Sequence, residues 1–352
     1  MNKLLGILLA GGKGQRLKQL TRELPKPLVP YAAQCRMIDF SLQNCVDSGV
    51  QEVMLLSKHM ETLIHQYLLA EWTHKIKIHF GPYQALHHQP AETVYASVQK
   101  PDEQGTADAL LNGREYIYRD GYEDVLILHS DHIYHYDFKK MYELHQSSKA
   151  ALTIGYQEIP LEYVKLFGMS RFDTDGNLVE FVEKPANPTA NTVFTAVCIF
   201  NIRLMYQYLD QLKHTEWRHD ISHDLIPAML RNGEIIKGIC FEDYWEDIGT
   251  TERFYKAHLN LVNGKIRLLP PQTLSDAKEV RLIDDEKRNR VLADSRVIRV
   301  DFKAENSVIF PGARIGEQCF IKNSVIMPDA ELPAGTHISN ALVSQGHIEY
   351  FH

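Results

Sequence analysis

Eight short apolar segments recur through the first 250 residues, and stretches with helical patterns separate them. The segments are Leu4–Ala10, Glu52–Leu56, Ile76–Phe80, Val125–His129, Ala151–Tyr156, Leu178–Val182, Val193–Phe200 and Ile235–Cys240. Continuous apolar strands separated by amphipathic helices are typical of a mainly parallel sheet that is covered on both faces. We therefore expect a Rossmann-like α/β fold. In such sheets ligands bind beyond the carboxyl ends of the strands, so functional residues should follow these segments directly.

From about residue 260 the pattern changes to a charged connector and then to a period of six. Aliphatic residues recur at Ile309, Ile315, Ile321 and Met327, a second set keeps the same spacing at Ala313, Cys319 and Val325, and the phase slips by one at Leu332 and Ile338. A hexapeptide repeat is typical of a left-handed parallel β-helix, whereas sandwich strands alternate with a period of two. We expect a first domain at residues 1–258, a connector at 259–290 and a short β-helix of two to three coils at 291–352.

The composition excludes several classes of protein. No apolar stretch approaches the roughly 18 residues of a membrane helix, and the apolar N-terminal segment is followed by glycines and charges, so we expect a cytoplasmic protein without membrane association. The five cysteines show no CxxC spacing, which predicts neither a zinc site nor a disulfide framework. A net charge of −7 argues against binding to nucleic acid, so local cations would have to hold any anionic substrate.

A glycine-rich turn and a lysine between two prolines are the first candidate functional features. Gly11, Gly12 and Gly14 follow an apolar segment, where they can present backbone N–H groups to a phosphate, and Arg16 adds positive charge. A plain tight turn is the alternative, since the P-loop ending is absent. Lys26 lies between two prolines that restrict the backbone, which predicts a cation on a stiff extended segment or, alternatively, a solvated surface turn.

Two aspartates follow apolar segments that are far apart in the sequence. Asp131 comes after Val125–His129, and Asp247 follows Ile235–Cys240. Both could bind one Mg²⁺ at the edge of the sheet, although helix caps or turns are the alternative for each. Glu183 and Lys184 end another apolar segment before a proline, and the segment at Gly105 and Thr106 starts a helix with small residues that a flat nucleobase could approach.

Eight motifs together resemble one enzyme family. In chain order they are LLAGGKGQRL, PKPLVP, RMIDFSLQNCVDSGV, GTADA, SDHIY, FVEKPANP, HDISHDLIP and YWEDIGT. The chain resembles the nucleotide-sugar pyrophosphorylases, and most closely the glucose-1-phosphate adenylyltransferases of bacterial glycogen synthesis. This resemblance implies a nucleotidyltransferase domain of the GT-A-like type, which makes ADP-glucose and pyrophosphate from ATP and glucose 1-phosphate. It also implies a homotetramer, or a hetero-oligomer with a homologue.

The resemblance assigns roles to particular residues. Those implied to bind the nucleotide are Ala10, Gly11, Gly12, Gly14, Gly105, Thr106 and Asp131. Those implied to bind the sugar phosphate are Gly168, Glu183, Lys184, Asp220 and Trp245. Arg16, Lys26, Asp131 and Asp247 are implied to be catalytic, with Mg²⁺ on the two aspartates. A sugar phosphate is already an anionic nucleophile, so no general base is required, and we expect His132 and the other histidines to be surface or structural residues.

Departures from the family pattern leave the substrates open. Phe194 stands where the family has a serine, and Ala196 where it has a glycine, which predicts weaker binding of the sugar phosphate or a blocked pocket. Lys58 and Glu103 replace residues near the base, so the adenine preference follows from the overall resemblance alone. Glu23 replaces a basic residue, which predicts weak or absent activation by fructose 1,6-bisphosphate. Uridylyl, thymidylyl or guanylyl transfer, and a non-catalytic regulatory subunit, are the alternative functions.

Overall fold

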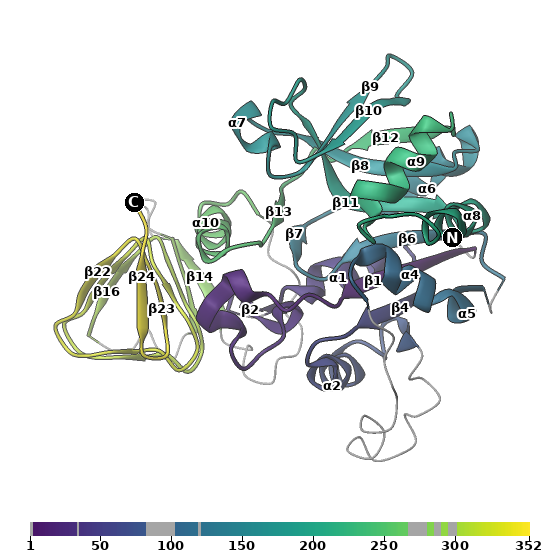
Figure 1. Cartoon of the computed structure of the whole chain (residues 1–352). Helices are drawn as coiled ribbons and strands as arrows, with labels where there is room; N and C mark the ends of the chain where they lie inside the picture. Colours follow the sequence, from purple (N-terminus) through teal and green to yellow (C-terminus); the bar gives the residue numbers. More distant parts are fainter. Residues whose placement is uncertain are drawn as a thin grey trace.

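The computed structural model describes residues 3–33, 35–81, 103–118, 121–266, 280–284, 290–294 and 301–352. It has a larger part, in which helices surround a twisted sheet, and a smaller coil of strands that ends at the C-terminus (Figure 1). Helix α10 (Thr251–Val262) lies between the two parts. No helix of the described segments is long and apolar enough to cross a membrane. Residues 267–279 and 285–289 of the expected connector, and Asp102 beside Glu103, lie outside the description.

The central sheet has nine strands, in the order β10-β9-β11-β6-β1-β4-β5, with β8 paired to both β11 and β12. Their bounds are β1 (Leu4–Ala10), β4 (Glu52–Ser57), β5 (Lys77–His79), β6 (Asp124–His129), β8 (Leu152–Glu158), β9 (Gly168–Phe172), β10 (Leu178–Glu183), β11 (Thr192–Asn201) and β12 (Ile236–Cys240). All eight predicted segments therefore contain strands. The sequence pattern missed β9, whose residues GMSRF mix apolar and polar side chains.

The expectation of a mainly parallel sheet is wrong for half of the strand pairs. Strand β1 runs parallel to β4 and β6, β4 to β5, and β8 to β12. In contrast, β11 is antiparallel to β6, β8 and β9, and β9 forms an antiparallel hairpin with β10. For β9 and β10 the reason is local, because the short turn at 173–177 can join antiparallel strands, whereas parallel strands need a long crossover. The fold is thus α/β with a mixed sheet that contains parallel strands.

Helices cover both faces of this sheet. The bounds of those longer than six residues are α1 (Ile38–Asp47), α2 (Glu61–Glu71), α4 (Thr106–Asn112), α6 (Phe138–Ser148), α8 (Ile202–Leu212) and α10, and the shorter ones are α5 (Arg114–Ile117), α7 (Leu161–Val164) and α9 (Ile226–Arg231). Side chains of β1 enter two separate apolar clusters, with Leu4 and Leu8 in one and Leu5, Ile7 and Leu9 in the other. Because both faces are buried, this strand has no polar residue.

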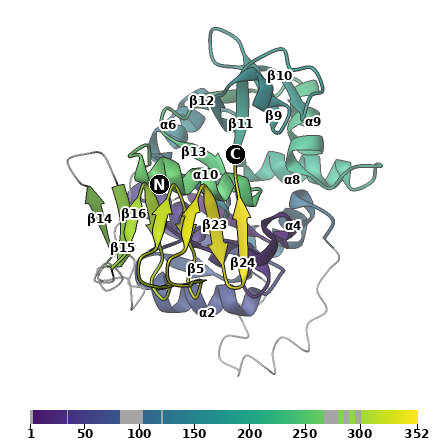
Figure 2. The same ribbon diagram turned by 90° about the vertical axis from the view of Figure 1, so that its left-hand side faces the viewer.

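The strands after residue 280 pair with one another. Their bounds are β14 (Val280–Asp284), β15 (Arg290–Asp294), β16 (Lys303–Glu305), β17 (Ser307–Ile309), β18 (Arg314–Ile315), β19 (Phe320–Lys322), β20 (Val325–Ile326), β21 (Glu331–Leu332), β22 (His337–Ser339), β23 (Ala341–Ser344) and β24 (His347–Tyr350). A mixed six-stranded sheet runs β14-β15-β17-β20-β23-β24, and two smaller parallel sheets run β16-β19-β22 and β18-β21. Figure 2 shows these strands side by side in front of α10.

The repeat of this coil is 17 residues, one fewer than three hexapeptides. Asn306, Asn323 and Asn340 stack through side-chain hydrogen bonds of 2.8 and 3.1 Å at this spacing, each with positive φ. Each 17-residue coil therefore has two sides of six residues and one side of five. The one-residue slip in the period of six arises from this shorter side. Ile326 consequently takes the inward position that the period of six assigned to Met327. Met327 instead joins the apolar cluster that the coil shares with the larger part.

The coil packs against the larger part through α10. Tyr255 of this helix donates a hydrogen bond to the backbone oxygen of Asn323 (2.8 Å), and its ring stacks on Phe351 with the centroids 4.4 Å apart. His258, one turn later, lies against Phe310 of the coil. A single apolar cluster spans the junction, so the two parts share a core.

Candidate active site

The glycine-rich turn follows β1 as expected and leads into a 3₁₀ helix, η1 (Gln15–Thr21). Gly11 and Gly12 are exposed, and nothing lies within 4 Å of the place where a Cβ on Gly12 would stand. Gly14 has a φ of 66°, and a Cβ there would lie 2.9 Å from the Cβ of Lys26. Glycine is required at this position both by the backbone angle and by close packing. The turn therefore leaves two glycine backbones open to a ligand and uses the third to seat Lys26.

Lys26 lies in a short 3₁₀ helix, η2 (Lys26–Leu28), rather than in the extended segment that the flanking prolines predicted. Pro25 is extended, whereas Pro27 occupies an early helical position, where its missing N–H is not needed. The lysine side chain is buried and forms an ion pair with Asp131. The cation is thus pre-organised by a partner as well as by the prolines.

Asp131 lies just beyond β6, in a loop that is anchored to β1. Both the backbone N–H and the hydroxyl of Ser130 donate hydrogen bonds to the carbonyl of Leu9, at 3.2 and 2.9 Å. Burial alone would raise the pKa of Asp131, but the charge of Lys26 outweighs it and holds this pKa well below its ordinary value. The carboxylate is therefore ionised at neutral pH and available to a cation.

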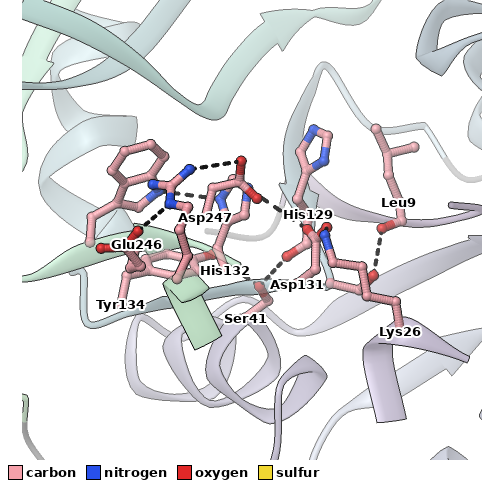
Figure 3. A network of polar contacts seen from close by, with 12 residues as sticks. Leu9, Lys26, Ser41, His129, Asp131, His132, Tyr134, Glu246 and Asp247 are labelled. Atoms are coloured by element: carbon pink, nitrogen blue, oxygen red, sulfur yellow. Dashed lines mark hydrogen bonds and ion pairs between the residues drawn. The ribbon is translucent and has the colours of Figure 1, made fainter. Parts of the chain in front are cut away.

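Asp247 reaches the same place through a two-stranded ribbon. Strand β13 (Trp245–Asp247) pairs antiparallel with β7 (His132–Tyr134), which directly follows Asp131, and Asp247 is opposite His132. The Nε2 atom of His132 lies 3.7 Å from Oδ1 of Asp131 and 3.9 Å from Oδ1 of Asp247 (Figure 3). The structure thus brings the two aspartates close to the same nitrogen of one imidazole.

The protonation of His132 follows from its other contact. The indole Nε1 of Trp245 donates to Nδ1 of His132 over 3.2 Å, and an indole N–H can act only as a donor. Burial lowers the pKa of His132 to about 4, so its imidazole is neutral at pH 7. With a lone pair on Nδ1, the single proton must be on Nε2, where it faces both aspartates. This histidine is therefore buried rather than at the surface, and its Nε2–H lies close to both carboxylates without a hydrogen bond to either.

The site can hold a hard cation. Ligand atoms of His129, Asp131 and His132 lie within 4.8 Å of one another. Since Nε2 of His132 carries a proton, the donors with free lone pairs are the carboxylates of Asp131 and Asp247, together with His129, whose ring stacks on His132. Oxygen ligands of this kind suit Mg²⁺ or a similar divalent ion.

A cleft of about 310 Å³ opens beside Asp131, and Asp247 does not line it. It brings together all but Gly14 of the residues implied to bind the nucleotide, namely Ala10, Gly11, Gly12, Gly105, Thr106 and Asp131, and Lys26 lines it as well. Arg16 does not line this cleft; its guanidinium instead lies beside Gly249, just after Asp247, with Nη2 3.4 Å from the place where a Cβ on that glycine would stand. Arg16 thus faces the motif that carries Asp247.

The residues implied to bind the sugar phosphate fall into two groups. Gly168 and Glu183 are opposite one another in the β9–β10 hairpin, and a Cβ on Gly168 would lie 2.8 Å from Glu183 Oε2. Lys184 has a positive φ of 48°, and its exposed ammonium lies 3.1 Å from Glu183 Oε1. Trp245 is buried, with its ring edge-on to Phe167. None of these four lines the cleft described above.

Asp220 has structural partners for both of its carboxylate oxygens. Oδ1 accepts from the backbone N–H groups of Ser222 and His223 at the start of a short helix, η5 (Ile221–Leu225), and Oδ2 accepts from the hydroxyl of Thr106 at 3.1 Å. A Cβ on Gly105 would meet the backbone oxygen of His219 at 2.1 Å. The close approach that Gly105 permits is therefore to the chain itself, and Asp220 holds this segment in place.

Of the two departures on β11, Phe194 lies in the core and Ala196 is half-buried against it. Phe194 is 5% exposed and packs edge-to-face on Phe181, so its ring does not enter the cleft. Ala196 has a φ of 59° at an irregularity in the pairing between β11 and β8. A left-handed backbone at this position explains why a glycine is the less strained residue there.

Sequence reasoning missed the roles of several residues in the cleft. Lys58, Glu103 and His129 all line it, yet Lys58 and Glu103 were considered only as departures. Lys58 follows β4 as Asp131 follows β6, so its place after an apolar segment was a usable signal. The contact between His132 and Trp245 joins residues 113 positions apart, and no local pattern indicates it.

Comparison with known proteins agrees with this geometry. A family model described as "Nucleotidyl transferase" matches residues 5–264. The valienol-1-phosphate guanylyltransferase of Streptomyces hygroscopicus subsp. limoneus is 42% identical over 332 residues, which cover 90% of this chain and 88% of the relative. The glucose-1-phosphate adenylyltransferase of Geobacillus stearothermophilus is 33% identical over 339 residues (91% and 83%), and that of Bacillus anthracis is 30% identical over 344 residues (91% and 90%).

Proposed function

The chain belongs to the nucleotidyl transferase family, and we propose that it transfers a nucleotidyl group from a nucleoside triphosphate to a sugar 1-phosphate or a similar 1-phosphate, with release of pyrophosphate. The observation that carries this proposal is the ion pair of Lys26 and Asp131 beside the open glycines of the first turn, with Asp247 close to the same histidine as Asp131. Positive charge, backbone donors and the carboxylate of Asp131 meet at one cleft, as phosphoryl chemistry requires.

The chemistry needs positioning and charge neutralisation rather than a proton carrier. A phosphate oxygen of the 1-phosphate attacks the α-phosphorus, and the bond between that phosphorus and the pyrophosphate breaks. The backbones of Gly11 and Gly12 and the cation Lys26 hold the triphosphate, and Arg16 adds positive charge beside Gly249. Glu183 and Lys184 orient the 1-phosphate substrate. Alignment of this kind supplies much of the rate, since the nucleophile is already ionised.

Asp131 and Asp247 would hold Mg²⁺, and their oxygen donors fit this ion. When bound there, Mg²⁺ neutralises charge on the phosphates. The Nε2–H of His132 lies close to both carboxylates, and the guanidinium of Arg253 lies beside Asp247, with Nη1 3.6 Å from Oδ2. The chain's own residues thereby prepare the site before the ion arrives.

Two groups of relatives support two different pairs of substrates. ATP and glucose 1-phosphate, with a role in glycogen synthesis, remain one candidate pair, which the relatives named glucose-1-phosphate adenylyltransferases support. A guanylyl transfer to valienol 1-phosphate is the other, supported by the relative with 42% identity. A regulatory subunit without activity is disfavoured, because Gly11, Gly12, Lys26, Asp131 and Asp247 are all present and brought together.

The finer structural predictions also stay proposals. Three parallel ladders with a common offset of 17 residues support a short left-handed β-helix at 291–352, beyond a catalytic domain at 1–258 and a connector at 259–290. A homotetramer, or a hetero-oligomer with a homologue, is retained as a prediction. Weak or absent activation by fructose 1,6-bisphosphate is also retained as a prediction. Glu23, on which this prediction depends, lines a second cleft with Arg22 and Arg36, where η1 meets the coil.

The test is a set of reactions of the purified protein with GTP, ATP, UTP and TTP, each offered with glucose 1-phosphate and with valienol 1-phosphate. Pyrophosphate release and the mass of the nucleotide product identify the reaction. We expect turnover with at least one pair, and we expect Lys184→Ala to raise the KM for the 1-phosphate. Absence of turnover with every pair, together with stimulation of a catalytic homologue, would instead favour the regulatory subunit.

A further inference from the structure

One end of the cleft carries a lysine and a carboxylate that the triphosphate does not need. Lys58 follows β4, Glu103 precedes α4, and both line the cleft. The ammonium of Lys58 donates to the backbone oxygen of Glu103 over 3.2 Å, and its Cβ lies 3.7 Å from where a Cβ on Gly11 would stand. The pair thus spans the cleft between the glycine turn and the first turn of α4.

The carboxylate of Glu103 is oriented by a hydrogen bond to one of its two oxygens. Its Oε1 accepts a hydrogen bond from Nδ2 of Asn112 at 3.2 Å, and its Oε2 accepts none from the residues that the structure describes. Glu103 is half-buried, and the apolar side chains of Leu56 and Ala109 line the same cleft. A flat ring against these side chains would therefore present its polar edge to a fixed carboxylate and a lysine.

The donor pattern of the bases decides which ring fits. A carboxylate accepts hydrogen bonds and a lysine donates them. Guanine offers two adjacent donors, N1–H and the N2 amino group, beside the acceptor O6, so it can pair with both side chains at once. Adenine offers one donor next to the N1 lone pair, and uracil and thymine flank their single N–H with two carbonyl oxygens, which a carboxylate repels.

We propose that Lys58 and Glu103 select GTP as the nucleotide substrate. This inference rests on the proposed function and adds the identity of the base to it. Glu103 accepts from N1–H and the N2 amino group of guanine, and Lys58 donates to O6, in the charge-assisted geometry that gives strong discrimination. The relative with 42% identity, named a guanylyltransferase, agrees with this choice.

Inosine triphosphate separates this mechanism from general purine binding, because it keeps O6 and N1–H but lacks the N2 amino group. For the wild type we expect kcat/KM for GTP to exceed that for ITP by roughly 10-fold and that for ATP by roughly 100-fold. In Glu103→Gln the ratio of kcat/KM for GTP to kcat/KM for ITP should be close to one. In Lys58→Met kcat/KM should fall by a similar factor for GTP and for ITP. Glu115→Gln, an exposed carboxyl change on α5, is the matched control and should leave the ratios unchanged.

Equal or better use of ATP by the wild type, or an unchanged GTP to ITP ratio in Glu103→Gln, would overturn the assignment. If no triphosphate gives pyrophosphate, the proposed function fails first, and calorimetric binding of GTP, ITP and ATP then decides the base assignment by itself. Tighter binding of GTP that depends on Glu103 supports the assignment, and equal binding of GTP and ATP contradicts it.

Discussion

The indole Nε1 of Trp245 donates a hydrogen bond to Nδ1 of His132 over 3.2 Å. Because this contact fixes the tautomer, the remaining imidazole proton on Nε2 faces Asp131 and Asp247. A tryptophan that family resemblance assigned to the sugar pocket therefore acts on the two carboxylates through a histidine that was expected to be a surface or structural residue. The relationship links the motifs that were predicted to bind the metal and the sugar.

Trp245→Phe tests this relationship, since it removes the N–H donor but keeps an aromatic ring. We expect kcat to fall roughly 10-fold, with a loss of about 1–2 kcal/mol in the free energy of unfolding from the smaller ring. The direct measurement is the ¹⁵N chemical shift of the two imidazole nitrogens of His132. The wild type should show the proton on Nε2, and the variant a mixture of tautomers. A proton on Nδ1 in the wild type would rule out the relationship.

The apolar segments of the sequence predicted where the strands lie, but they did not predict whether neighbouring strands pair parallel or antiparallel. Ala151–Tyr156 and Val193–Phe200 both read as buried strands, yet their antiparallel pairing depends on the turns and crossovers that join them. The period of six identified the C-terminal coil, but the inward position of Ile326 in place of Met327 follows from a 17-residue turn. The stacked asparagines at 306, 323 and 340 carry this spacing in the sequence and would have revealed it.

Phe194 stands where the family has a serine, and substitutions of Phe194 test whether this position faces the substrate in this chain. Its ring is buried against Phe181, so Phe194→Ser should lower the free energy of unfolding by roughly 3–5 kcal/mol, as loss of a buried aromatic ring does. Phe194→Leu, which keeps most of the apolar volume, should cost about half as much. Urea denaturation gives both values. Unchanged stability with a lower KM for the 1-phosphate in Phe194→Ser would place the ring at the substrate instead.

Ala196 carries backbone strain that a glycine would relieve. Its φ of 59° is unfavourable for alanine, so Ala196→Gly should raise the free energy of unfolding by up to about 1 kcal/mol. Ala190 is half-buried and has no positive φ, so Ala190→Gly is the matched control and should lose about 0.5 kcal/mol through the freer unfolded chain. Equal losses in both variants would show that Ala196 is not strained.

Asp39 gives the fold a pH dependence. It is fully buried and accepts hydrogen bonds from Trp72 Nε1 (2.7 Å), the hydroxyl of Tyr67 (2.8 and 2.9 Å) and the backbone N–H of Arg36 (2.7 Å). Burial outweighs these contacts and raises the pKa of Asp39 from 3.8 to about 6. A raised carboxyl pKa stabilises the folded state at low pH, and this contribution is lost as the pH rises through about 6.

We therefore expect the wild type to lose roughly 2 kcal/mol relative to Asp39→Asn between about pH 4.5 and pH 7.5. The difference between the two proteins in urea midpoint across this range measures the effect. Asp47→Asn, an exposed change at the end of the same helix, should follow the wild type. A difference that stays constant with pH would mean that Asp39 titrates at an ordinary value.

The chemistry of the site was easier to predict than its geometry. Gly11, Gly12, Lys26, Asp131 and Asp247 each follow or flank a recognisable segment, and the carboxyl ends of the strands bring most of them together. The partners of Asp220 and Gly105 were not predictable, because Thr106 and His219 meet them across more than 100 residues. Close packing between distant segments leaves no periodic signal in the sequence.

Asp247→Asn tests the central claim, that two carboxylates beside the glycine turn hold the cation for nucleotidyl transfer. It is a cleaner change than Asp131→Asn, which would leave the buried Lys26 without its ion-pair partner at a cost of about 3 kcal/mol. Asp243→Asn, an exposed change four residues earlier, is the control. The measurement combines turnover with Mn²⁺ affinity in the presence of nucleotide. We predict a loss of at least about 100-fold in kcat and about 10–100-fold weaker Mn²⁺ binding in Asp247→Asn, and neither in the control; wild-type turnover and Mn²⁺ affinity in Asp247→Asn would contradict the account.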